Sequence, residues 1–145
     1  MSFLRSAAGA TLLLASVSGA IAQLGPEMSK AVDMSCPKDA GRKEFGKPQV
    51  QSLFASMGVS PGKVEAAAAR LDGHCKRCLT HELTQRLGAS GLATFEKAMN
   101  PATEKEVDQQ TGNRLVQEFA AAGVFCTMSL GKEIENETRA LFNRH

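Results

Sequence analysis

The chain has 145 residues, of which 43% are hydrophobic, and its 17 Lys and Arg residues nearly balance its 15 Asp and Glu residues, for a formal net charge of +2. Nucleic-acid-binding proteins usually carry a strong basic excess on one face, so this balance argues against a nucleic-acid partner. Trp and Tyr are absent and Phe is the only aromatic residue. This composition favours closely packed helices over strands.

Residues 1–22 have the pattern of a secretory signal peptide. Arg5 supplies a short positive region, residues 7–18 form an apolar and small-residue run, and a small-x-small cleavage site ends at Ala22. The apolar run is shorter than the roughly 20 residues that a membrane-spanning helix needs. We therefore expect cleavage after Ala22 and a secreted or periplasmic mature domain over residues 23–145, with no membrane span.

Two short helices are predicted early in the mature chain. Residues 26–35 begin with Pro, which is permitted at the first helical position, and their apolar residues fall on one side. Residues 37–47 are polar and contain glycine, so we expect a loop there. Residues 48–57 again begin with Pro and carry apolar residues at helical spacing, and Gly58 ends the pattern.

A longer helix is predicted over residues 61–87, with Gly88 as its C-terminal stop. Gly73 lies in its middle and costs roughly 1 kcal/mol relative to Ala in a helix, so this is where we expect a bend. Ser90 then opens a short helix that Asn100-Pro101 closes.

The last predicted helical region is the longest. Thr103 and Glu106 have the spacing of a capping box, and apolar residues then recur every three or four positions to Leu141. Gly123 and Gly131 leave open whether the region is one helix or two. No segment has the pattern of a strand, so the predicted fold is all-α: a small, irregular, disulfide-stapled bundle of about four to five helices.

Four cysteines remain after the signal peptide: Cys36, Cys75, Cys78 and Cys126. An even number in a small exported domain indicates two disulfides. Residues three apart on a helix have Cβ atoms about 5–6 Å apart, whereas a disulfide brings them to about 3.5–4.5 Å, so a bond within the C-x-x-C pair would strain the helix. We predict that Cys36 and Cys126 each bond to one member of the pair, with Cys36–Cys78 and Cys75–Cys126 slightly favoured.

The segment 74–81 also allows a chemical interpretation, through His74, Cys75, Cys78 and His81. Imidazole and thiolate suit Zn or Cu(I), but four ligands on two helical turns surround one ion poorly. Basic neighbours could lower a thiol pKa for thiol–disulfide exchange, although thioredoxin-like proteins place C-x-x-C beside strands. Haem attachment requires His directly after the second Cys, where this chain has Leu79.

The chain carries no G-x-S-x-G, H-E-x-x-H or glycine-rich phosphate motif, so we assign no catalytic residue, metal or cofactor. By elimination, we expect an exported, non-catalytic helical protein that binds another envelope or secreted macromolecule, as an inhibitor, immunity or accessory protein does. The alternative is an envelope thiol-redox or metal-handling protein that uses residues 74–81. Because exposed loops on a rigid scaffold often carry function, the candidate contact surface is a basic segment: Lys38, Arg42, Lys43 and Lys47.

Overall fold

The computed structural model describes residues 24–143, so the predicted signal peptide and its cleavage site lie outside the described residues. Within this range the chain forms α-helices and one short 3-10 helix, without a strand, as the all-α prediction requires. The elements are α1 (Pro26–Ser35), α2 (Ala40–Phe45), α3 (Pro48–Ser56), α4 (Pro61–Asp72), α5 (His74–Met99), η1 (Glu104–Glu106) and α6 (Gln109–Phe142). None of these helices combines the length and hydropathy needed to cross a bilayer.

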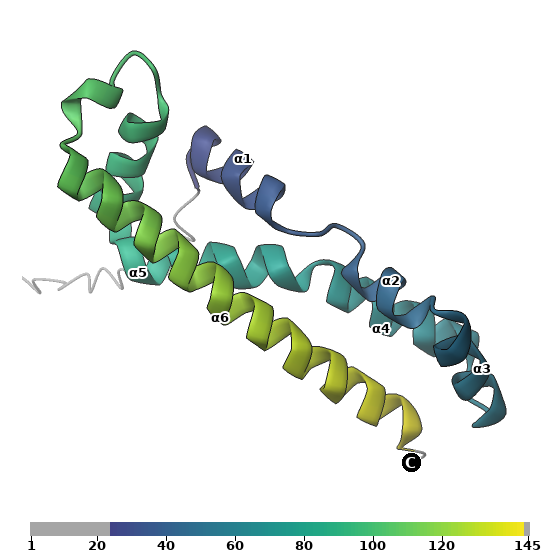
Figure 1. Cartoon of the computed structure of the whole chain (residues 1–145). Coiled ribbons are helices and arrows are strands. Elements are labelled where there is room, and N and C mark those ends of the chain that lie inside the picture. The colour runs from purple at the N-terminus through teal and green to yellow at the C-terminus, as the bar shows by residue number, and fades with distance from the viewer. Residues whose placement is uncertain (1–23, 144–145) are drawn as a thin grey trace, which may run out of the picture.

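Helix α6 is one continuous helix of 34 residues, and neither Gly123 nor Gly131 breaks it. It runs alongside α5 and then α4, as Figure 1 shows. Its first half buries Leu115, Ala122 and Cys126 against α1 and α5, and its second half packs against α3 and α4. Contacts on both sides of each glycine hold the backbone helical and outweigh the low helix propensity of glycine.

The capping box predicted at Thr103 is wrong. Thr103 precedes η1, and its hydroxyl donates to the carbonyl of Lys97 at 2.9 Å instead of capping a helix. Asp108 caps α6: its Oδ1 accepts a hydrogen bond from the backbone N–H of Thr111 at 2.8 Å. An Asp at the N-cap satisfies a backbone donor that the first helical turn leaves free.

The predicted helix over 61–87 is divided at Gly73, where α4 ends and α5 begins. Gly88, the expected stop, instead produces a kink within α5, with a backbone φ of 64° and ψ of −179°. Glycine is the residue that adopts this conformation without a steric penalty. The short helix predicted from Ser90 is the second half of α5.

The apolar interior consists of two clusters, one on each side of Gly73. The first lies between α1, α5 and α6 and includes Met28, Leu79 and Leu83. The second lies between α2, α3 and α4, is centred on Phe54 and Leu71, and is covered by the end of α6. Because α6 contacts both clusters, it connects the two parts of the bundle.

The loop predicted over residues 37–47 is wrong, since α2 lies inside it. One carboxylate oxygen of Asp72 on α4 accepts hydrogen bonds from the backbone N–H groups of Gly41 at 2.8 Å and Arg42 at 3.1 Å. Phe45, only 2% exposed, packs edge-on against Phe54 with ring centroids 5.5 Å apart. The polar, glycine-containing segment becomes helical because α4 supplies both its cap and its apolar contact surface.

Candidate functional site

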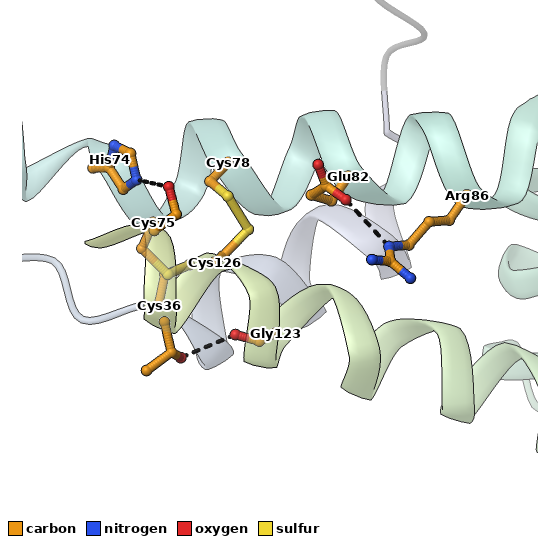
Figure 2. Close-up of a disulfide and its surroundings, with 10 residues drawn as sticks. Cys36, His74, Cys75, Cys78, Glu82, Arg86, Gly123 and Cys126 are labelled. Carbon is orange, nitrogen blue, oxygen red and sulfur yellow. Dashed lines mark hydrogen bonds and ion pairs between the residues drawn. A yellow bond between two sulfur atoms is a disulfide. The ribbon is translucent and has the colours of Figure 1, made fainter. Parts of the chain in front are cut away.

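Two disulfides attach to the first two turns of α5. Cys36, directly after α1, is bonded to Cys75, and Cys78 is bonded to Cys126 on α6 (Figure 2). The prediction that Cys36 and Cys126 each bond to one member of the C-x-x-C pair is confirmed. The favoured pairing, Cys36–Cys78 with Cys75–Cys126, is wrong.

The observed pairing follows from the positions along α5 at which α1 and α6 contact it. Helix α6 is antiparallel to α5: Glu118 pairs with Arg86 at 3.5 Å, and Ser129 lies 3.0 Å from His74. Cys126, between those two contacts, therefore faces Cys78.

Helix α1 is also antiparallel to α5. Near its start, the backbone N–H of Met28 bonds to Glu96, and near its end Asp33 pairs with Lys76 at 2.9 Å. The chain leaving α1 therefore reaches the beginning of α5, where Cys36 meets Cys75.

The histidines of the 74–81 segment lie apart from one another. Nε2 of His74 is 3.0 Å from the hydroxyl of Ser129, with the donor set by the imidazole tautomer, whereas His81 is exposed. All four sulfurs are in disulfides, so none is a thiolate ligand. Among the residues that the structure describes, no three His, Cys, Asp or Glu side chains are grouped so that they could hold a metal ion.

The basic segment is spread over α2 and its flanks, and most of its charges are paired within the chain. Arg42 lies 3.5 Å from Glu65 and 3.6 Å from Asp72. Lys43 pairs with Asp39 at 3.2 Å, and Lys47 pairs with Glu44 at 2.7 Å. Lys38 stands apart from these three, at a cavity beside Cys36. The segment is therefore an ion-paired helical surface and not a cluster of free cations.

An apolar groove that the sequence analysis missed lies between α1, the end of α5 and the start of α6. Its volume is about 610 Å³. Met34 (81% exposed), Met99 (49%) and Val116 (66%) line it, and Phe95 and Phe119 stack within it at a centroid distance of 6.2 Å. The sequence feature that could have indicated this groove is Val116 on α6, an apolar residue outside the apolar stripe that faces the core.

Comparisons of the chain with protein-family models, with curated proteins and with solved structures found no match. The functional interpretation therefore depends on the chain's own chemistry. Its two disulfides indicate an oxidising compartment, in which such bonds persist. They also join α1 and α6, two of the three helices around the groove, to the third helix, α5.

Proposed function

We propose that the mature chain is an exported, non-catalytic helical protein that binds another protein of the envelope or the extracellular space. The observation that carries the proposal is the apolar groove between α1, α5 and α6, with Met34 and Val116 largely exposed at its edge. Exposed apolar concavities with polar rims are typical of protein-interaction sites. The disulfides preserve the shape of the groove, which lowers the ordering cost of binding.

The groove fits a partner that inserts apolar side chains from one helix. It is formed between helices, as in helix-in-groove recognition, and the side chains of Met34 and Met99 can adapt to the shape of an inserted residue. Glu27 and Lys30 lie on its rim, so both a negative and a positive side chain are present for polar contacts. The groove supports binding better than the basic segment does, because Arg42, Lys43 and Lys47 are already paired within the chain.

The test compares two surfaces of the protein in one assay. Partners are captured from the envelope extract of the source organism, and the affinity of each purified candidate is then measured against purified variants. Val116→Glu places a charge in the groove. Met128→Glu is the matched control, because Met128 is 72% exposed on the same helix outside the groove. The double variant Arg42→Glu/Lys43→Glu tests the basic segment.

We expect Val116→Glu to raise the dissociation constant about tenfold or more, because it places a charge where the partner's apolar side chains would be buried. Met128→Glu and the double charge reversal should change it less than about threefold. If affinity survives Val116→Glu and falls with the double reversal, the contact surface is the basic segment and the groove assignment is wrong. Circular dichroism of each variant confirms that the helices are intact.

A further inference from the structure

We propose that the Cys36–Cys75 disulfide is a site of thiol–disulfide exchange with a small anionic thiol, whereas Cys78–Cys126 is a structural bond. This assignment is independent of the apolar groove and of any protein partner. It gives the two bonds, anchored three residues apart on α5, different chemical roles.

The first observation is access. A cavity of about 420 Å³ opens beside Cys36, between the end of α1 and the junction of α4 with α5. Its lining includes Pro37, which directly follows Cys36, and Gly73, over which the Arg77 guanidinium lies. Cys36, Cys75 and Cys78 are each half-buried, whereas Cys126 is only 2% exposed. Cys36 also lines the cavity, so a thiol in solution has room to approach it, and it reaches Cys36 more readily than Cys126.

The second observation is charge. Three cations line the cavity, Lys38, Lys76 and Arg77, together with two carboxylates. Asp33 is paired with Lys76 at 2.9 Å, and Asp72 accepts hydrogen bonds from the first turn of α2 and lies 3.6 Å from Arg42. Since the pair with Asp33 also engages Lys76, the positive excess at the cavity comes from Lys38 and Arg77. It attracts a thiol that carries a carboxylate or sulfonate, and it favours the thiolate over the thiol.

The exchange balances without a further oxidant. The incoming thiolate attacks Sγ of Cys36, a new sulfur–sulfur bond forms between them, and the Cys36–Cys75 bond breaks with its electron pair leaving on Cys75. Cys75 is the second residue of α5, where the free backbone N–H groups of the helix stabilise a thiolate leaving group. A second thiol molecule then releases Cys36 as a thiol and leaves as the small-molecule disulfide.

Opening this bond leaves the rest of the packing around α1 in place. Met28 and Val32 remain in the first apolar cluster, and Glu96 still accepts hydrogen bonds from the start of the helix. Only the covalent connection between the end of α1 and α5 is released, and the ion pair between Asp33 and Lys76 can remain. The modified protein is therefore expected to stay folded, so the exchange can be measured on the native state.

The experiment exposes the folded mature protein to limiting 2-mercaptoethanesulfonate or to 2-mercaptoethanol, which differ in charge at the end away from the thiol. Samples are quenched with acid, alkylated and mapped by peptide mass spectrometry. We expect the sulfonate adduct on Cys36 and alkylation on Cys75 before either Cys78 or Cys126 is modified. The sulfonate should react about threefold faster or more.

A charge variant and its control test the role of the cavity. Lys38→Glu should remove the preference for the sulfonate, whereas Lys105→Glu, an exposed lysine on η1, should retain it. The proposal is overturned if both disulfides open together or Cys78–Cys126 opens first. It is equally overturned if the two thiols react alike, or if the two lysine variants behave alike.

Discussion

Oε1 of Glu96 accepts a hydrogen bond from the backbone N–H of Met28 at 2.9 Å, across 68 positions of sequence. Its Oε2 accepts another from Glu27 at 3.1 Å. The N-cap of α1, Gly25, has no side chain to cap the helix itself. The carboxylate of Glu96 on α5 therefore caps α1. It fixes the position of α1 along α5, and in this position Cys36 lies next to Cys75.

Glu96→Ala should lower the free energy of unfolding by about 1–2 kcal/mol, the usual cost of losing an N-cap whose donors are left partly buried. The measurement is urea denaturation followed by circular dichroism. Glu104→Ala, on exposed η1, is the control and should change stability by less than about 0.5 kcal/mol. Equal effects of the two substitutions would contradict the capping role of Glu96.

Two glycine-to-alanine substitutions should change the stability of the protein in opposite directions. A Cβ on Gly41 would overlap the backbone carbonyl of Ala68, so Gly41→Ala should separate α2 from α4 and destabilise the protein by about 1–3 kcal/mol. A Cβ on Gly131 has no atom within 4 Å. Gly131→Ala should therefore stabilise α6 by about 0.5–1 kcal/mol. Thermal denaturation of the pair checks this, and a destabilising Gly131→Ala would count against one continuous α6.

The ion pair between α4 and α6 should make stability depend on pH. Arg70 donates from Nε and Nη2 to the two carboxylate oxygens of Glu137, at 2.7 and 2.8 Å. The hydrogen bond from Arg70 holds the pKa of Glu137 below its ordinary value of 4.5, against a smaller opposing effect of burial. Because the pKa is lower in the folded state, the contribution is complete well above pH 4.5 and is lost as pH falls through the folded pKa.

Glu137→Gln should therefore reduce stability at neutral pH and flatten the decline in stability below pH 4.5. Urea denaturation at several pH values from neutral to acidic provides the curves. Glu135→Gln is a matched control, since Glu135 pairs within α6 with Arg139 and does not connect two helices. A decline in the Glu137→Gln protein as steep as in the parent would show that this carboxylate does not contribute.

Removing either disulfide should lower the free energy of unfolding by about 4 kcal/mol. The bonded cysteines are separated by 39 positions in one bond and 48 in the other. Loop-closure entropy in the unfolded chain then predicts a loss of about 4 kcal/mol for Cys36→Ala/Cys75→Ala and a similar loss for Cys78→Ala/Cys126→Ala. Chemical denaturation measures both. A loss below about 1 kcal/mol for either double variant would mean that the bond does not restrain the unfolded chain.

Much of the helical pattern was predictable because its signals are local. Pro26, Pro48 and Pro61 open helices, and Gly58, with a backbone φ of 70°, follows the end of α3 as predicted. The break at Gly73 also coincides with a residue of low helix propensity. In these segments the residues that define the boundary lie next to it in sequence, so no tertiary information is needed.

The parts that were missed depend on contacts between distant segments. Helix α2 is capped by Asp72, 31 positions away, and its amino acids alone resemble a loop. The pairing of the cysteines depends on the positions along α5 at which α1 and α6 contact it. The spacing of the cysteines in the sequence does not determine these positions. The groove is likewise formed by three helices, and only the position of Val116 off the core-facing stripe indicated it.

The connectivity of the four cysteines is the decisive measurement, because it reports both their oxidation and the arrangement of α1, α5 and α6. Trypsin cleaves after Lys76 and Arg77, so it separates Cys75 from Cys78 without reduction. The structure predicts that residues 31–38 are linked to 71–76 and residues 78–86 to 115–132. Recovery of free thiols, or of peptide 71–76 linked to 78–86, would show that α5 is not joined to α1 and α6 by these two disulfides.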